Sequence, residues 1–298
     1  MESIVTAPSQ KPISVSKFLT GRLYGLGSDS VMTKLQKGEI LLNGQVAKAS
    51  DLVQGHDIIS IETDNRPNIV AEDIPLHIVF ENENVLVLNK PAGMAMHKGL
   101  GVYTGTLLNA LAGYYEKSGQ TSNVPNGLAH RLDKNTSGLV VVGKSAEARN
   151  LLSLQFADKS AKRIYTGYVW NNPGNSTLDL PIGRDPKNET IIKVLEEGGK
   201  EAVTHFRTLH SNALWSKMEW ELETGRTHQI RVHMHHLVCP ILADERYTIE
   251  LSEEQAHLER ILKENYKGHF LHATKLSFIE PITKEELSFE CAEPFRVG

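Results

Sequence analysis

Cysteine is nearly absent from this sequence. Only Cys239 and Cys291 occur among its 298 residues, so the disulfide framework of a small secreted protein is not expected. No stretch approaches the roughly 18 consecutive apolar residues that suggest a membrane span. The first residues also lack the cationic start and apolar run of a signal peptide. We therefore expect a cytoplasmic protein that does not associate with a membrane.

An excess of positive charge is also missing. The formal net charge is −4, which counts against nucleic-acid binding because contacts to phosphates need Lys and Arg. Local clusters of cations matter more than the total, however. Hydrophobic residues make up 40% of the chain and charged residues 23%, a balance that indicates a globular protein with a sizeable core. We find no internal repeat and no Gly-rich phosphate loop before a helix.

A polar, proline-containing segment divides the chain into a small and a large part. In the small part, apolar residues at helix-like spacing precede the pair Asn43-Gly44, which lies between two short apolar runs and predicts a β-hairpin. The expected organisation is a flexible tail at 1–10, a small α/β domain at 11–66, a linker at 67–75 and a large domain at 76–298.

The large part has the pattern of an α+β domain. Strand signals with hairpin-like spacing outnumber regular strand–helix alternation, so we predict a mixed, mainly antiparallel sheet. Helices are expected at 107–115 after Thr106, at 146–156 after Ser145 and at 252–265 after Ser252. Strands are expected at 139–142, 164–170, 202–209, 217–223 and 274–279.

Asp133 lies in the segment from Ala129 to Leu139, which has the highest density of ionisable side chains that could take part in catalysis. This acid has His130, Arg131 and Lys134 as close neighbours, and a continuous apolar strand follows. The pattern is typical of a surface turn with a hydrogen-bonded Asp. It also fits a carboxylate that a nearby Arg keeps ionised, so that it can act as nucleophile or base. Spacing alone does not decide between the two.

Four histidines occur within nine residues in the segment from Glu223 to His236. They suggest a metal site, but on a helix they would not share one face at the i, i+4 spacing of a zinc helix. We therefore favour structural or RNA-facing histidines.

A third segment, Lys162 to Trp170, has the composition of an ordinary strand. It would also suit a Tyr that stacks on a base beside cations.

Together these segments resemble the pseudouridine synthases of the large-subunit ribosomal RNA type. The resemblance covers roughly residues 76–295, and its motifs occur in the family's order. The motifs are Asn89-Lys90-Pro91-Ala92-Gly93, His130-Arg131-Leu132-Asp133, Lys162 with Tyr165 and Val169, Gly225-Arg226-Thr227-His228-Gln229-Ile230-Arg231, and Leu271-His272-Ala273. Residues 13–62 resemble, more loosely, the small S-four-like RNA-binding domain often found at the N-terminus of such enzymes.

The resemblance implies the roles of the catalytic residues. Asp133 would be the nucleophile, Tyr165 would pack on the target base and assist proton removal, and Arg231 would pair with Asp133. Arg131 would enter the RNA where the base leaves. We also expect His130, Arg226, His228 and Lys90 to contact RNA. No metal or other cofactor is implied.

The chemistry of the implied reaction explains these residue types. Uracil must leave the stack before its glycosidic bond can be reached. A carboxylate in a desolvated pocket tends to protonate, so a paired Arg is needed to keep it charged. After the base rotates and is rejoined through carbon, a proton must leave that carbon, and a Tyr beside the base can take it.

The sequence departs from the family's pattern at Val238 to Asp244. The family commonly has Gly and His before the Pro, and Gly before this Asp, so the sequence does not predict the geometry of this loop. We expect the protein to act as a monomer on structured RNA. Large-subunit ribosomal RNA is the first candidate for this substrate and transfer RNA is the second. The alternatives are a non-catalytic RNA-binding module and a metal-dependent hydrolase built on the histidine cluster.

Overall fold

Two compact units make up the chain. The computed structural model describes residues 2–6, 11–20, 28–61, 69–99, 102–119 and 127–297. Contacts divide the chain into Met1–Ile69 and Val70–Gly298. Parts of the predicted tail (1 and 7–10) and linker (67 and 68) lie outside the described residues. Within the described ranges, no helix has the length and apolar character needed to cross a membrane.

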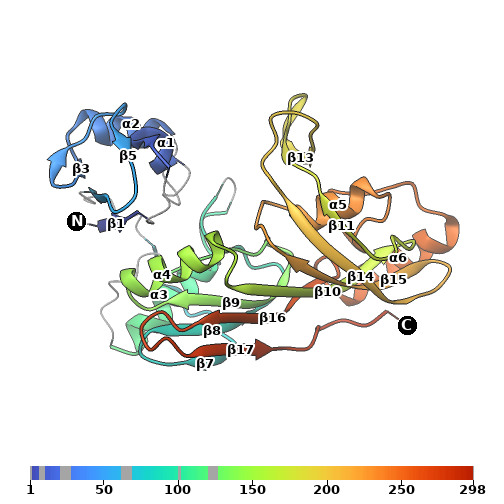
Figure 1. Ribbon diagram of the computed structural model, residues 1–298. Helices are drawn as coiled ribbons and strands as arrows, with labels where there is room; N and C mark the ends of the chain where they lie inside the picture. Colours follow the sequence, from blue (N-terminus) through green and yellow to red (C-terminus); the bar gives the residue numbers. More distant parts are fainter. Residues whose placement is uncertain are drawn as a thin grey trace. The chain divides into compact units, whose positions relative to one another are not determined.

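In its described ranges the first unit combines two short helices with small antiparallel sheets. A four-stranded sheet has the order β1-β6-β3-β4, and β2 pairs with β5. The elements, labelled in Figure 1 where there is room, are β1 (Glu2–Val5), β2 (Ile13–Ser14), α1 (Val15–Thr20), α2 (Ser28–Gln36), β3 (Ile40–Leu42), β4 (Gln45–Val46), β5 (Leu52–Val53) and β6 (Ile58–Ile61).

The local sequence explains the hairpin and one departure from prediction. Asn43 and Gly44 join β3 to β4 with φ angles of 51° and 81°, the left-handed pair that a type I′ turn requires, so the predicted hairpin is confirmed. The prediction of a flexible tail at 1–10 is wrong for Glu2–Val5, which pairs with β6 as β1. Ile4 and Val5 favour extended backbone, and β6 offers them an open sheet edge.

The described residues of the second unit form one large sheet, a two-stranded hairpin and four helices. In chain order its elements are β7 (Ile78–Glu81), β8 (Val85–Lys90), α3 (Leu107–Lys117), β9 (Ser137–Gly143), α4 (Ala146–Ala157), β10 (Lys162–Trp170), β11 (Ser176–Asp179), β12 (Ile182–Asp185), β13 (Asn188–Val194), β14 (Val203–Ser211), β15 (Trp215–Leu222), α5 (Gln229–His236), α6 (Glu253–Asn265), β16 (Leu271–Ile279) and β17 (Glu286–Glu290). The predicted helices are confirmed, with Thr106, Ser145 and Ser252 as their N-caps.

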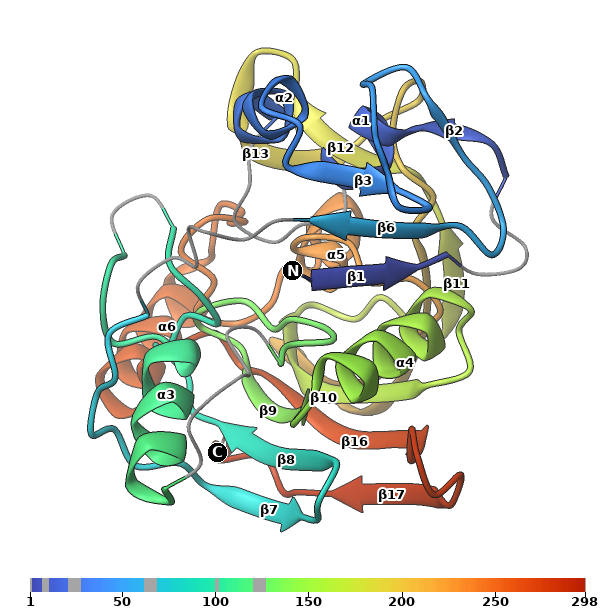
Figure 2. The same ribbon diagram turned by 90° about the vertical axis from the view of Figure 1, so that its left-hand side faces the viewer.

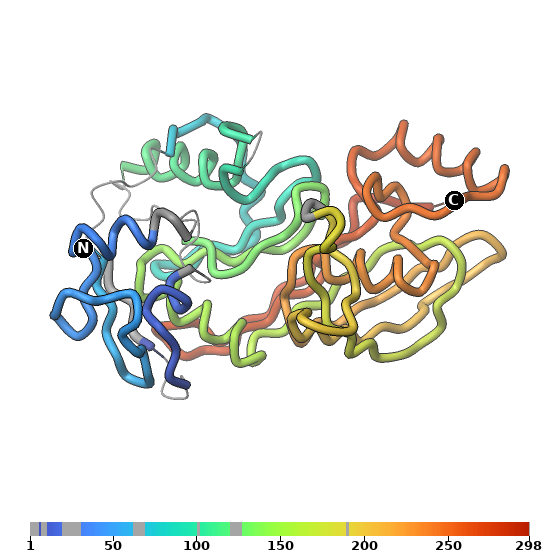
Figure 3. Tube along the Cα trace, turned by 90° about the horizontal axis from the view of Figure 1, so that it is seen from above, coloured from blue at the N-terminus to red at the C-terminus, as the bar shows by residue number. Residues whose placement is uncertain are grey.

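The nine-stranded sheet has the order β11-β14-β15-β10-β16-β9-β8-β7, and β17 pairs with the C-terminal part of β16. Its strand pairs are antiparallel except β16 with β9, which are parallel. The predicted mixed, mainly antiparallel sheet is therefore confirmed. Figure 3 shows the result: β10 and β16 connect a half that carries α3 and α4 with a half that carries α5 and α6.

The parallel contact depends on a glycine. Gly138 of β9 lies opposite Ala273 of β16 with a φ of 117°, and a Cβ atom there would come within 2.4 Å of the Ala273 backbone. Only glycine fits this close approach. Ala273 also lies opposite Tyr165 of β10. The register thus places Tyr165 level with the start of β9, directly after the loop that carries Asp133.

Separate apolar clusters hold the two halves. Helix α4 packs on β9 and β16 (Figure 2) over a core that includes Val141, Leu152 and Phe278. In the other half an aromatic cluster forms around Phe270, and the hairpin β12–β13 packs by its partly buried isoleucines against Val232 of α5. These cores fix the strands and helix from which the site is built.

Candidate active site

Asp133 lies in the loop that leads into β9. The side chains alternate in direction there: His130 and Leu132 are buried, whereas Arg131 is exposed and Asp133 is half-buried. The Asp133 carbonyl accepts a hydrogen bond from the Thr136 N–H at 3.1 Å, which closes a turn before the strand. The alternation turns the Asp133 carboxylate out of the core, and its side chain is 15% exposed.

Arg231, in the first turns of α5, joins two carboxylates. Its Nη1 donates to Oδ2 of Asp133 at 2.9 Å. Its Nε and Nη2 donate to Oδ2 and Oδ1 of Asp244 at 2.6 and 2.9 Å. The guanidinium carbon also lies 5.0 Å from the centre of the Tyr247 ring, a cation–π contact. Arg231 is therefore held by Asp133, which precedes β9, and by Asp244 and Tyr247 from the loop after α5.

The charge of Arg231 keeps Asp133 ionised. Burial by itself would raise the pKa of the Asp133 carboxyl, but the neighbouring His228 and Arg231 outweigh it and the pKa is lowered. Because burial lowers the pKa of His228 to about 4, this imidazole is neutral near pH 7. The guanidinium is therefore the cation that holds the carboxylate in its charged form at neutral pH.

Tyr165 approaches the same region from β10. Its side chain is almost fully buried, and burial raises the pKa of its phenol, opposed by Arg163 and reinforced by the negative charge of Asp133. The phenol is thus protonated near neutral pH. The structure brings Tyr165, Asp133 and Arg231 within electrostatic reach of one another, although they are up to 98 positions apart in the chain.

His228 lies at the site, and Arg226 lies on the surface beside it. His228 precedes α5 with a left-handed φ of 59°. Its Nδ1 shares a hydrogen bond with the Tyr247 hydroxyl at 2.8 Å, and its Nε2 lies 3.9 Å from Oδ2 of Asp133. Arg226 is exposed, and its Nε donates to the Glu201 carbonyl at 2.9 Å.

Two residues that we expected to contact RNA, His130 and Lys90, are buried and make contacts inside the domain. His130 is buried, its Nε2 accepts the Val141 N–H at 3.1 Å and its ring packs on Phe156. Lys90 is also buried, and its ammonium donates to the carbonyls of Pro91, Met94 and Lys134. Lys90 thus has three carbonyl acceptors inside the domain, whereas the buried Nδ1 of His130 has no hydrogen-bond partner among the described residues. Both side chains position loops around the site. Contact of either side chain with RNA stays a prediction.

The clustered histidines are dispersed by the fold. His233 points inward to Thr204 and the Leu180 carbonyl, whereas His235 contacts the Thr248 carbonyl. Among the described residues, no group of three or more His, Cys, Asp and Glu side chains is placed to hold a metal ion. Histidines that are close together in the sequence therefore have different environments in the described part of the fold and do not form a metal site there.

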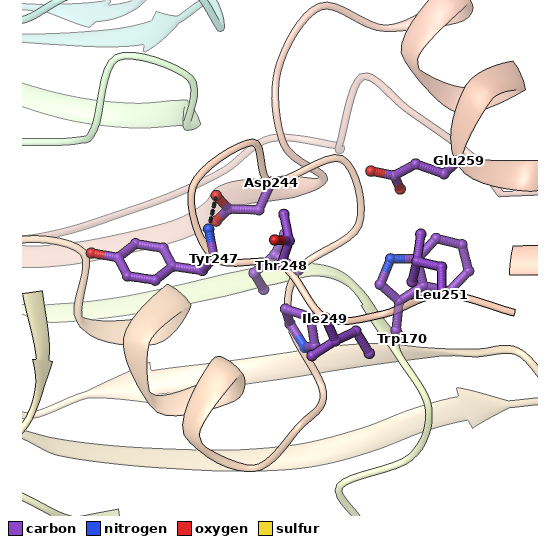
Figure 4. A pocket seen from close by; sticks show the side chains of 9 residues that line it. Trp170, Asp244, Tyr247, Thr248, Ile249, Leu251 and Glu259 are labelled. Atoms are coloured by element: carbon purple, nitrogen blue, oxygen red, sulfur yellow. Dashed lines mark hydrogen bonds between the residues drawn. The ribbon is translucent and has the colours of Figure 1, made fainter. Parts of the chain in front are cut away.

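Asp244 and Tyr247 belong to the site although the sequence did not single them out. Figure 4 shows Asp244 accepting a hydrogen bond from the backbone N–H of Tyr247, beside a cavity of about 20 Å³, room for about one water molecule. One signal could have identified Asp244: like Pro240, it keeps the residue type of the family's pattern within an otherwise divergent loop.

Comparison with known proteins agrees with this geometry. A family model described as RNA pseudouridylate synthase matches residues 84–236, a span that contains Asp133, Tyr165 and Arg231. The chain belongs to this family. The predicted resemblance is confirmed, and with it an isomerase that acts on uridine in RNA.

Relatives match over most of the chain. The ribosomal large subunit pseudouridine synthase D of Neisseria meningitidis serogroup B is 38% identical over 87% of this chain and 70% of its own length. An uncharacterised RNA pseudouridine synthase of Bacillus subtilis is 34% identical over 98% of this chain and 94% of its own. The solved structure of human RNA pseudouridylate synthase domain containing 4 superposes with a TM-score of 0.59 at 26% identity, covering 73% of this chain and 88% of that one.

Proposed function

We propose that this synthase isomerises specific uridines in large-subunit ribosomal RNA. The support is the set of relatives named ribosomal large subunit pseudouridine synthase D, which match 87% of this chain at 34–38% identity in Neisseria meningitidis and Xanthomonas campestris. The names of those proteins refer to the large subunit of the ribosome. Transfer RNA is the second candidate, and we expect the enzyme to work as a monomer in the cytoplasm.

Asp133 acts as the nucleophile in this proposal. The observation that carries it is the one-sided contact of its carboxylate: Oδ2 accepts the hydrogen bond from Arg231, whereas Oδ1 accepts none from the described parts of the chain. An ionised carboxylate with one open oxygen can attack a flipped uridine at its sugar or its ring. Either attack leads to cleavage of the bond between C1′ of the sugar and nitrogen one of the base, so that the base can turn and form the new bond from its carbon five to C1′.

Tyr165 would pack on the flipped base and assist in removing the proton from carbon five. Its aromatic ring suits stacking on uracil. Because its phenol is protonated near neutral pH, it can take up that proton only as its own proton passes on. The carboxylate of Asp133, released when the new bond has formed, is a suitable acceptor within electrostatic reach. The net reaction consumes and releases no proton, since nitrogen one of the base regains one.

Exposed cations next to the carboxylate would hold the RNA. Arg131 is exposed beside Asp133 and would fill the gap that the flipped base leaves in the RNA. Arg226 and His228 would contact the RNA from the segment before α5. For the first unit we propose an S-four-like RNA-binding domain at 11–66, joined by a linker at 67–75 to the catalytic domain at 76–298. The first unit has its own apolar core, which includes Phe18 and Ile59.

Position-resolved pseudouridine mapping of total RNA, with and without the gene, tests the substrate. Loss of one or a few pseudouridines from large-subunit ribosomal RNA supports the proposal. If pseudouridines were lost only from transfer RNA, the substrate would be transfer RNA and the proposed chemistry would stand. An unchanged map, together with RNA binding by the purified protein, would favour a module that binds RNA without modifying it.

A further inference from the structure

Arg231 divides its hydrogen bonds unequally between two carboxylates. Asp244 accepts from Nε and Nη2, whereas Asp133 accepts from Nη1 alone. The Asp244 side chain is completely buried, and that of Asp133 is 15% exposed. The two-fold contact is thus made to the buried carboxylate and the single contact to the partly exposed one.

The loop after α5 fixes Asp244 in this position. Its Oδ1 also accepts the backbone N–H groups of Arg246 and Tyr247 at 3.0 and 3.1 Å, as Figure 4 shows for Tyr247. The Tyr247 ring in turn covers the face of the Arg231 guanidinium. With its edge held by Asp244 and its face covered, the guanidinium cannot rotate to offer a second N–H to Asp133.

An Arg and a carboxylate that meet without such a restraint often form two parallel hydrogen bonds, one to each carboxylate oxygen. A pair of this kind would engage both oxygens of Asp133. It would keep the carboxylate ionised, but it would leave no oxygen free for attack.

We propose that Asp244 is a positioning residue that restricts Arg231 to one hydrogen bond with Asp133 and thereby keeps Oδ1 of Asp133 open as the attacking atom. This inference rests on the proposed function, because only a nucleophilic Asp133 needs an open oxygen. Asp244 acts through Arg231 and has no contact with the substrate in this scheme.

The substitution Asp244→Asn tests the restraint. Asn offers one acceptor and one donor where Asp offers two acceptors, so Arg231 loses at least one of its contacts there and becomes free to turn toward Asp133. Removal of a nearby anion and a closer guanidinium both lower the pKa of Asp133. The ionisable groups that act on Asp133 or are acted on by it are Lys90, Tyr165, His228, Arg231 and His269, and the substitution removes none of them.

Glu280→Gln is a matched control. Glu280 is also a completely buried carboxylate, and its Oε2 accepts two backbone N–H groups, those of Ile282 and Thr283, in the same way as Oδ1 of Asp244. It has no contact with Arg231. The control therefore measures what neutralising a buried, turn-stabilising carboxylate does to the fold alone.

The experiment measures single-turnover tritium release from transcribed large-subunit ribosomal RNA labelled at carbon five of uridine, across pH, for the full-length enzyme. For Asp244→Asn we expect a plateau rate at least about tenfold below wild type, with the acidic limb of the profile unmoved or displaced to lower pH. Glu280→Gln should lose thermal stability but keep the wild-type profile per folded molecule.

Two results would overturn the inference. A plateau for Asp244→Asn equal to that of Glu280→Gln would mean that Asp244 only stabilises the fold. An acidic limb displaced to higher pH would mean that Asp244 draws Arg231 toward Asp133 and does not restrain it. Failure of the proposed function itself would be seen separately, as full turnover by Asp133→Asn in the same assay.

Discussion

Lys90 Nζ lies 3.2 Å from the backbone carbonyl oxygen of Lys134, the residue that follows Asp133. The same ammonium donates to the carbonyls of Pro91 and Met94 at 2.8 and 2.9 Å. One buried side chain therefore ties the loop after β8 to the loop that carries Asp133. Its three N–H donors match three acceptors.

Lys90→Met should destabilise the protein and loosen the Asp133 loop. Methionine fills a similar volume but leaves three buried carbonyls without their charged donor, at an expected loss of about 2–5 kcal/mol. Chemical denaturation measures the loss, and single-turnover rates measure the loosening. Lys144→Met is the control: Lys144 is also mostly buried but pairs with Glu81 away from Asp133. Equal rates in the two variants would contradict a link between Lys90 and the site.

Asp133→Asn should abolish isomerisation and leave the fold and RNA binding largely intact. The amide is nearly isosteric with the carboxylate, but it is not a nucleophile. Tritium release from RNA labelled at carbon five of uridine measures turnover, and filter binding measures RNA affinity. Turnover above about one per cent of wild type would remove Asp133 from the role of nucleophile.

Tyr165→Phe should separate stacking from proton transfer. Phenylalanine keeps the aromatic face, so RNA affinity should stay within about 1 kcal/mol of wild type, whereas loss of the ring altogether would cost roughly 1–3 kcal/mol. Without the hydroxyl, removal of the carbon-five proton should slow, and an enzyme–RNA adduct should accumulate on denaturing gels. Tyr168→Phe makes the same change on the same strand, inside the aromatic cluster around Phe270, and should retain the wild-type rate.

Val238→Gly should raise stability. Val238 has a φ of 58°, a left-handed conformation that is strained for a β-branched residue, and the family commonly has Gly at this place. Relief of strain outweighs the greater freedom of glycine in the unfolded chain, so we expect a gain of about 0.5–1 kcal/mol. Thermal unfolding measures it. Val79→Gly, at an exposed strand position of the same unit, should instead lose stability, and a loss in both variants would mean that Val238 is unstrained.

The sequence predicted the fold better than it predicted which neighbours of Asp133 are exposed. Hairpin signals and helix caps are local, and they yielded the mixed sheet and the helix bounds. We expected His130 to be accessible because it adjoins Arg131 and Asp133 in the chain, but its side chain is buried whereas that of Arg131 is exposed. The alternation of apolar Leu132 with Asp133 carried that information.

Other features could not be predicted because they depend on contacts between distant segments. Asp244 reaches Arg231 from a loop whose sequence departs from the family's pattern, and no periodicity marks such a contact. The hairpin β12–β13 was not predicted either. Its strands are held by cross-strand pairing and by Ile191 and Ile192 against α5, which only the assembled domain provides.

Arg231→Ala should lower the rate and shift the acidic limb of the pH–rate profile to higher pH. In the folded enzyme burial raises the pKa of Asp133, but His228 and Arg231 outweigh it and the pKa lies below its usual value. Without the guanidinium the effect of burial is opposed less strongly, so the pKa rises. The carboxylate then becomes ionised, and the enzyme active, only at higher pH.

Asp244 strengthens this effect, because Arg231→Ala leaves it buried without its partner and its anion adds to the repulsion on Asp133. The sign is therefore opposite to that expected for Asp244→Asn, and the two variants measured side by side under single-turnover conditions distinguish the charge of Arg231 from its orientation. Circular dichroism at each pH confirms that folded enzyme is compared. A profile for Arg231→Ala that is lowered but parallel to wild type would mean that Arg231 positions RNA and does not act on the ionisation of Asp133.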